Sequence, residues 1–252
     1  MPIITLLTDY GTSDSYVAEV KGVLLSAAPG SVLVDITHEV TPGDVAGAGY
    51  ILTRAAAVYP AGTVHLAVVD PGVGTARAAL ALKVRDQYFV GPDNGLFGGV
   101  MRGAEVEAVQ LPTPDGASAT FHGRDIFAPA AARLARGEAL DRLGQRYAGM
   151  PRRLSGAVPH YEGKVVIGEV IHVDRYGNLV TNLTTEFVPP YAVLEAESLT
   201  IGPIRSTFGD VEKGGLLAYV GSGGTIEIAV RDGSAARRLG LGVGGRVRAR
   251  LG

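Results

Sequence analysis

The sequence predicts an α/β protein with an N-terminal domain built on a mostly parallel sheet, followed by a smaller antiparallel β-barrel domain. Residues 1–155 alternate apolar runs of strand length with segments of helical periodicity. Residues 156–252 carry β-rich runs that are separated by glycine-containing turns. The chain has 252 residues, of which 46% are hydrophobic, so each domain can bury a core of its own.

The expected strands of the first domain are short apolar runs, at residues 3–8, 31–36, 63–69, 79–84 and 88–90. The expected helices have apolar residues three and four positions apart, at residues 14–28, 46–57 and 126–136. Strands that alternate with helices form parallel sheets, whose ligands bind beyond the carboxyl ends of the strands. Asp9 and Asp70 each follow such an end, which makes both candidate site residues.

The second domain is expected to be almost entirely β-structure. Its strands are predicted at residues 164–173, 192–201, 216–220, 225–230 and 246–251. One short helical turn is expected at residues 235–239. This pattern is typical of a small antiparallel barrel.

Composition favours a cytoplasmic protein that does not bind nucleic acid. The net charge of −2 and the absence of a long basic run argue against a nucleic-acid partner. No apolar stretch reaches the length of a membrane span, and the first residues do not resemble a signal peptide. With no cysteine, disulfides, thiolate nucleophiles and zinc–thiolate sites are excluded.

Several common catalytic templates are missing. There is no P-loop and no Gly-x-Ser-x-Gly elbow, and Arg77 stands where a dinucleotide fingerprint starting at Gly72 needs its third glycine. The five histidines lie at residues 38, 65, 122, 160 and 172, without the His-Glu-x-x-His spacing of a zinc site. No metal site is therefore expected.

Four polar segments of the first domain remain as candidates. Asp9 can accept two hydrogen bonds from a vicinal diol such as a ribose, or it can be a turn residue. Asp70 and Arg77 bracket a glycine-rich turn and can form a catalytic pair or a bracing ion pair. Asn94 suits an ordinary turn, and His122 can be structural, with Asp125 after it as a helix N-cap.

In the second domain, the segment from Asp174 to Asn178 and the loop containing Ser222 are candidates. Both also suit simple hairpin connections between strands.

Taken together and in order, these motifs resemble one family, the S-adenosylmethionine hydroxide adenosyltransferases, relatives of the fluorinase and chlorinase. The motifs that carry the resemblance are Thr8-Asp9-Tyr10-Gly11, Asp70-Pro71-Gly72-Val73-Gly74-Thr75, Gly91-Pro92-Asp93-Asn94-Gly95, Phe121-His122-Gly123-Arg124-Asp125-Ile126-Phe127 and Asp174-Arg175-Tyr176-Gly177-Asn178. The resemblance implies an α/β domain, a β-barrel domain and a homotrimer. It also implies active sites between the first domain of one subunit and the second domain of its neighbour.

The resemblance further implies a reaction in which water, as hydroxide, attacks the ribose C5′ of S-adenosyl-L-methionine and releases L-methionine and adenosine. The family's catalytic Asp, Arg and His correspond to Asp70, Arg77 and His122. Arg77 would stabilise hydroxide, and His122 would hydrogen-bond the water and accept or relay its proton. Asp70 would orient the cation and the water. No acid is needed to expel the neutral thioether, because the sulfonium is already an activated leaving group. No cofactor is implied, since S-adenosyl-L-methionine is the substrate.

The resemblance also assigns substrate-binding residues in both domains. Asp9 would hold the ribose diol, Asp174 and Asn178 the methionine ends, and Tyr176 would stack beside adenine. The remaining members of the implied set are Tyr16, Asn94, Ser222 and Val230. Near the last of these the chain departs from the family, since Arg231-Asp232-Gly233 stands where relatives commonly have an Asn-Gly-rich turn.

Three other functions stay open at this point. A halogenase would share the fold, but the segment at residues 103–120 is short and lacks the extra loop associated with the fluorinase. A metal-dependent phosphomonoesterase would use Asp9, Asp14, Asp70 and Asn94 as a cation site. A non-catalytic sensor of S-adenosylmethionine or adenosine would need the binding residues but neither Arg77 nor His122.

Overall fold

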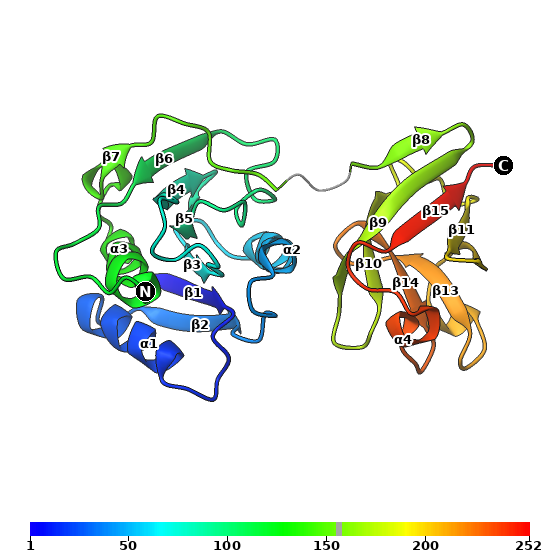
Figure 1. Ribbon diagram of the computed structural model, residues 1–252, viewed down its shortest axis with the longest axis horizontal. Coiled ribbons are helices and arrows are strands. Elements are labelled where there is room, and N and C mark those ends of the chain that lie inside the picture. The colour runs from blue at the N-terminus through cyan, green and yellow to red at the C-terminus, as the bar shows by residue number, and fades with distance from the viewer. Residues whose placement is uncertain (155–157) are drawn as a thin grey trace. The chain divides into compact units, whose positions relative to one another are not determined.

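The computed structural model describes residues 1–154 and 158–252. The first compact unit ends at Leu154, and the second comprises the described residues that follow (Figure 1). The first unit is an α/β sheet domain and the second a closed β-barrel, so the predicted fold class is confirmed. The expected domain boundary between residues 155 and 156 lies outside the described residues.

The first unit contains a seven-stranded sheet in the order β2-β1-β3-β5-β4-β6-β7. Its parallel half contains β1 (Ile3–Thr8), β2 (Val32–Thr37), β3 (Val64–Val68) and β5 (Gln87–Pro92). Its antiparallel half adds β4 (Ala79–Val84), β6 (Val106–Gln110) and β7 (Gln145–Arg146). Of these strands, β6 and β7 were not expected from the sequence.

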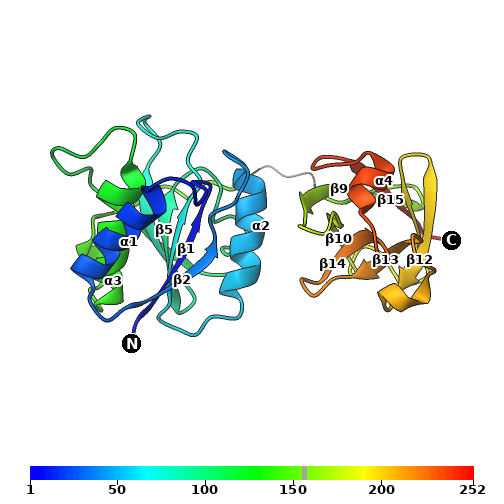
Figure 2. The same ribbon diagram turned by 90° about the horizontal axis from the view of Figure 1, so that it is seen from below.

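Helices cover both faces of this sheet (Figure 2). The helices α1 (Tyr16–Ala27) and α3 (Ala128–Ala135) lie on one face and pack on each other. The helix α2 (Val45–Ala56) covers the other face, buries Ala48, Leu52 and Ala56 along one stripe, and is capped by the Asp44 side chain. Two apolar cores result, one on each side of the sheet.

The pairing of β1 with β3 sets the position of the candidate site. Thr8 lies opposite Val68 in the parallel register, so both strands end at the same edge of the sheet. Asp9 and Asp70 follow at that edge, as the sequence predicts for a ligand-binding edge.

The helix expected at residues 126–136 begins earlier and in a different form. A π-helical turn, η1 (Gly123–Phe127), leads directly into α3, and the Ala128 N–H bonds to the Gly123 carbonyl five residues back. The expectation that Asp125 is a helix N-cap is wrong, since Asp125 lies inside this turn. Its carboxylate instead accepts the Ser118 N–H at 2.8 Å and pairs with Arg124.

The second unit is a barrel of seven strands, closed by the pairing of β10 with β9. The barrel strands are β9 (Val165–Val173), β10 (Leu179–Thr184), β11 (Val193–Ala196), β12 (Leu199–Arg205), β13 (Leu216–Val220), β14 (Thr225–Val230) and β15 (Arg246–Arg250). Neighbouring strands are antiparallel except for the pair β12 and β13. Short elements complete the described chain: η2 (Leu140–Arg142) in the first unit, and β8 (His160–Glu162), η3 (Phe208–Asp210) and α4 (Ala235–Leu239) in the second.

One expected strand of the barrel is in fact two. Residues 192–201 fold into the hairpin of β11 and β12, whose turn contains Glu197 at a φ of 53°. A two-residue hairpin turn requires positive φ, which usually calls for glycine or asparagine. Because residue 197 is a glutamate, the sequence does not indicate a turn there. The strand β10 was also missed, because its polar residues favoured a turn.

Among the described residues, no helix is long and apolar enough to cross a membrane.

The core of the first unit predicts a pH-dependent stability. His65 on β3 is fully buried and stacks on Phe89, and burial lowers its pKa from 6.5 to about 4. Below pH 6.5 the unfolded chain therefore takes up a proton that the folded chain refuses. We expect the free energy of unfolding to fall between pH 6.5 and pH 4, by up to roughly 3 kcal/mol from this group. Denaturant titrations of the wild type and of His65→Gln test this, and equal pH dependence in the two proteins would contradict it.

Candidate active site

The structure brings the three predicted catalytic side chains into direct contact. Arg77 Nε lies 3.0 Å from each carboxylate oxygen of Asp70, and Arg77 Nη2 also donates to Asp70 Oδ2. The same Nη2 lies 2.8 Å from His122 Nδ1. One guanidinium therefore joins Asp70, which follows β3, to His122, which precedes η1.

The glycine-rich turn after β3 is shaped to present this pair. Gly74 has a φ of +76°, and a Cβ there would meet the Ala119 carbonyl at 2.8 Å. The Val73 N–H bonds back to the Asp70 carbonyl, which closes the turn. Arg77 then lies over the Phe127 ring at 5.2 Å. The turn is thus fixed by contacts that a bulkier residue at position 74 would break.

Because this cluster is buried, its disruption should lower the stability of the protein. The side chains of Asp70 and Arg77 are only 6% and 7% exposed, and His122 is 8% exposed. An Arg–carboxylate fork in such surroundings is strong because water does not compete for it. Removal of one partner from a buried ion pair typically costs about 3–5 kcal/mol. The contacts of Asp70 and Arg77 therefore agree with an ion pair that braces the turn and equally with a catalytic pair.

The protonation state of His122 follows from its contact with Arg77. A guanidinium has N–H donors and no acceptor, so His122 Nδ1 must accept the bond and carry no proton. Burial lowers the pKa of His122, and the positive charge of Arg77 lowers it further. The ring is therefore neutral at pH 7, with its proton on Nε2.

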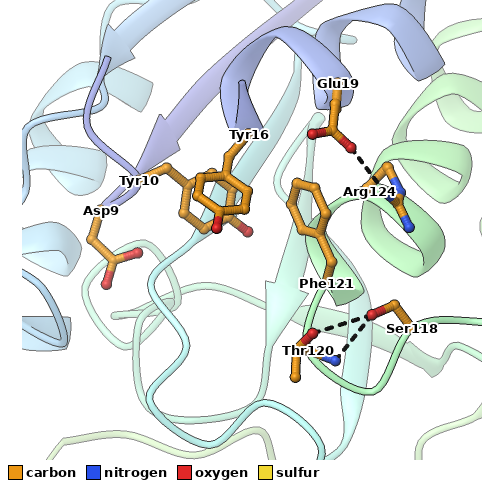
Figure 3. Close-up of a pocket in the computed structure, with 8 residues that line it drawn as sticks. All are labelled: Asp9, Tyr10, Tyr16, Glu19, Ser118, Thr120, Phe121 and Arg124. Atoms are coloured by element: carbon orange, nitrogen blue, oxygen red, sulfur yellow. Dashed lines mark hydrogen bonds and ion pairs between the residues drawn. The ribbon is translucent and has the colours of Figure 1, made fainter. Parts of the chain in front are cut away.

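A cavity of about 550 Å³ opens at the same edge of the sheet (Figure 3). Its lining residues are Asp9, Tyr10, Tyr16, Glu19, Ser118, Thr120, Phe121 and Arg124. Two predicted substrate-binding residues, Asp9 and Tyr16, thus line one pocket. Tyr10, Phe121 and Arg124 stand in motifs singled out in the sequence, where they were given no role, whereas no sequence signal pointed to Glu19.

Tyr10 connects this pocket to the catalytic cluster. Burial raises the pKa of its hydroxyl, and the negative charges of Asp9 and Asp70 raise it further. A Cβ on Gly123 would lie 2.2 Å from this hydroxyl, so residue 123 must be glycine for Tyr10 to keep its place. The phenol is neutral, and its hydroxyl lies next to Gly123, the residue that follows His122.

Aromatic rings form one side of the pocket. Tyr10, Tyr16 and Phe121 contact one another with ring centroids 5.3 to 6.1 Å apart. Arg124 lies over Phe121 and bonds to Glu19 at 2.8 Å, which Figure 3 shows beside the rings. The pocket therefore offers apolar ring surface next to the carboxylate of Asp9.

Asn94 is engaged in its own turn. Its amide nitrogen donates to the Val69 carbonyl at 2.8 Å, and its amide oxygen accepts the Leu96 N–H at 3.2 Å. It does not line the cavity. Its observed contacts hold the loop after β5 against the carboxyl end of β3.

Three predicted residues of the second unit, Asp174, Tyr176 and Asn178, lie in a compact loop between β9 and β10. The Asp174 carboxylate accepts bonds from the N–H groups of Tyr176 and Asn178 and from the Asn178 side chain, at 2.8 to 2.9 Å. Tyr176 is 77% exposed. The loop thus presents an aromatic ring above a rigid polar base.

Ser222 lies in the turn before β14, and Val230 is the last residue of that strand. Ser222 is exposed in the turn between β13 and β14, whereas Val230 is buried in the barrel core. Of Val230, therefore, the main chain and not the side chain is suited to ligand contact. In the described part of the chain, no group of three His, Asp or Glu side chains is arranged to hold a metal ion.

This protein thus combines an α/β domain and a closed barrel with a buried Asp–Arg–His cluster. Family models match residues 4–144 as the SAM hydroxide adenosyltransferase N-terminal domain and residues 168–248 as the C-terminal domain. The chain belongs to the SAM hydroxide adenosyltransferase family, which confirms the resemblance seen in its motifs.

Individual relatives agree with this assignment. A protein of Thermus thermophilus named (R)-S-adenosyl-L-methionine hydrolase is 42% identical over 257 residues, covering 97% of this chain and 98% of the relative. A Salinispora tropica protein with the same name is 43% identical, covering 100% of this chain and 98% of the relative. A fluorinase of Nocardia brasiliensis is 28% identical, covering 100% of this chain and 97% of the fluorinase.

Solved structures share the whole architecture. The crystal structure of an uncharacterized conserved protein from Thermotoga maritima matches with a TM-score of 0.90 and 37% identity. The match covers 98% of this chain and 99% of that one.

The contact between Arg77 and His122 predicts a measurable titration. Substitution Arg77→Met removes the positive charge beside His122 and leaves the Asp70 anion unpaired, so the pKa of His122 should rise. The variant Arg77→Lys keeps the charge without the fork and should give a smaller rise. Proton NMR of the histidine Cε1–H groups measures both. An unchanged His122 titration would contradict the geometry.

Proposed function

We propose that the protein hydrolyses S-adenosyl-L-methionine to adenosine and L-methionine. The observation that carries this proposal is the buried cluster of Asp70, Arg77 and His122 beside a pocket that contains Asp9. Relatives named as hydrolases of this substrate, with more than 40% identity over nearly the whole chain, support it.

The chemistry needs a positioned nucleophile more than an acid. A water gives its proton to the solvent, the oxygen of the resulting hydroxide forms a bond to the ribose C5′, and the electron pair of the C5′–S bond leaves with sulfur. The sulfonium becomes a neutral thioether, so the leaving group needs no proton. Because the attack is an in-line displacement, the main task of the protein is to align oxygen, carbon and sulfur.

Arg77 and His122 supply the electrostatic part of this task. Arg77 places a fixed positive charge where hydroxide forms, and Asp70 holds the guanidinium in place. His122 Nε2 carries a proton, so the ring donates a hydrogen bond to the nucleophilic oxygen. With Nδ1 occupied by Arg77, the ring acts as a donor to the nucleophile rather than as its base.

The binding roles are assigned from the family resemblance and from the pocket. Asp9 holds the ribose diol, and Tyr16 lines the adjacent wall. Asp174 and Asn178 hold the methionine ends, exposed Tyr176 stacks beside adenine, and Ser222 with the main chain at Val230 completes the site. Asn94 acts through its turn, behind the residues that touch substrate.

We also propose a homotrimer in the cytoplasm, with each site formed by residues of two subunits. This proposal rests on the family resemblance, and no cofactor or metal is assigned a role. Analytical ultracentrifugation should give a mass three times that of the 26.0 kDa chain. A monomer that retains full hydrolytic activity would contradict it.

The first test is product analysis by chromatography. Purified protein with S-adenosyl-L-methionine should yield equal amounts of adenosine and methionine, with chelator present and halide absent. His122→Ala should lower kcat by at least about 100-fold, because it removes a donor to the reacting oxygen. A 5′-halo-adenosine formed with chloride or fluoride would identify a halogenase, and binding without turnover would leave a sensor.

The same assay should discriminate between the two sulfonium epimers. The relatives named above are hydrolases of the (R) form, and we propose the same preference here. Pure (R) substrate should be consumed faster than pure (S) substrate. The reverse order would contradict this part of the proposal.

Substitution Asp9→Asn tests the binding role of the pocket. The amide keeps the size of the side chain but loses the charge that strengthens two hydrogen bonds to a diol. We expect KM to rise by at least about tenfold, with a much smaller change in kcat. A fall in kcat at constant KM would move Asp9 from binding to chemistry.

A further inference from the structure

A second buried histidine lies at the candidate site and has no role in the reaction described above. His38 directly follows β2 and is 4% exposed. Because β2 is parallel to β1, His38 lies at the same carboxyl edge of the sheet as Asp9. Its neighbour across this edge is Thr8, the last residue of β1, which is 1% exposed.

The side chains of His38 and Thr8 are directly bonded. Thr8 Oγ1 lies 2.8 Å from His38 Nδ1, and it accepts the Tyr10 N–H at 3.3 Å. With Tyr10 donating to this oxygen, the Thr8 hydroxyl proton is available for Nδ1. On the other side of the ring, His38 Nε2 lies 3.1 Å from Asp35 Oδ1. Asp35 in turn pairs with Lys21 of α1 at 2.7 Å.

The segment after β2 forms two further hydrogen bonds, with Asp9 and Gly11, which follow Thr8 in the chain. The Gly11 N–H donates to the His38 carbonyl at 2.8 Å. The Gly43 N–H donates to Asp9 Oδ2 at 2.9 Å. The turn at residues 8–11 is therefore bonded to the segment after β2 through a side chain, a carbonyl and an amide.

We propose that His38 is a positioning residue, which acts through Thr8 to hold Asp9 and Tyr10 in the geometry that binds ribose. The inference rests on the proposed binding role of Asp9. His38 does not touch the substrate in this account. It fixes the start of a turn whose next residue carries the carboxylate and whose following residue carries the pocket wall.

The chain contains a matched control for this interaction. Thr5 of the same strand bonds through Oγ1 to Nδ1 of His65 at 2.7 Å, and both residues are fully buried. His65 contacts Tyr59 and Phe89, and neither Thr5 nor His65 lines the pocket. A purely structural Thr–His bond is thus available on the same strand as Thr8.

The test compares Thr8→Val with Thr5→Val, each of which removes only the hydroxyl. We expect Thr8→Val to raise KM for S-adenosyl-L-methionine by at least about tenfold, with kcat within about threefold of wild type. We expect Thr5→Val to leave both constants unchanged, even if it lowers Tm equally. His38→Ala should repeat the effect of Thr8→Val. His38→Asn, whose amide oxygen can accept the Thr8 proton, should restore part of the affinity.

A binding measurement separates positioning from general loosening. Calorimetry with adenosine and 2′-deoxyadenosine reports how well the site recognises the diol. Wild type should prefer adenosine, and this preference should shrink toward equality in Thr8→Val but persist in Thr5→Val.

The outcomes distinguish this inference from the proposed function. Hydrolysis by wild type, together with normal KM and normal diol preference in Thr8→Val, would overturn the inference and leave the function intact. Adenosine binding without hydrolysis would overturn the function, while the diol preference would still test the inference. Absence of both hydrolysis and adenosine binding in wild type would overturn both.

Discussion

One guanidinium holds the candidate site together. Arg77 binds Asp70 through a fork and His122 through a single N–H, and all three side chains are nearly removed from water. Because a guanidinium can only donate, the contact determines which nitrogen of His122 carries the proton. The electrostatics of the site, the neutrality of the imidazole and the direction of its remaining donor all follow from this arrangement.

The fold supplies the surroundings that this interaction needs. Parallel strands β1, β2 and β3 end at one edge, so Asp9, His38 and Asp70 meet there although the chain separates them widely. The π-helical turn η1 begins directly after His122 and leaves Gly123 next to the Tyr10 hydroxyl. Such turns often mark functional sites, since they redirect side chains at the start of a helix.

Much of the fold was predictable because apolar periodicity reports burial directly. Asp9 and Asp70 were also predictable from the sequence, since each directly follows an apolar run of strand length. His122 was not derivable from spacing alone, because it lies 45 residues from Arg77, and only the resemblance linked them. Glu19 looks like an ordinary surface charge in the sequence, whereas Arg124 stands in a quoted motif but had no role assigned to it. The hairpin at Glu197 was missed because its positive φ is carried by a residue that rarely adopts it.

Hydrolysis in water enriched in oxygen-18 tests the central claim most directly. If hydroxide held near Arg77 and His122 attacks the ribose C5′, the label must appear in the 5′ oxygen of adenosine and not in methionine. Mass spectrometry of the two products, taken from one reaction with S-adenosyl-L-methionine, reads this out. Methylthioadenosine together with labelled homoserine would mean that water attacks the amino-acid carbon, and the account of this site would then be wrong.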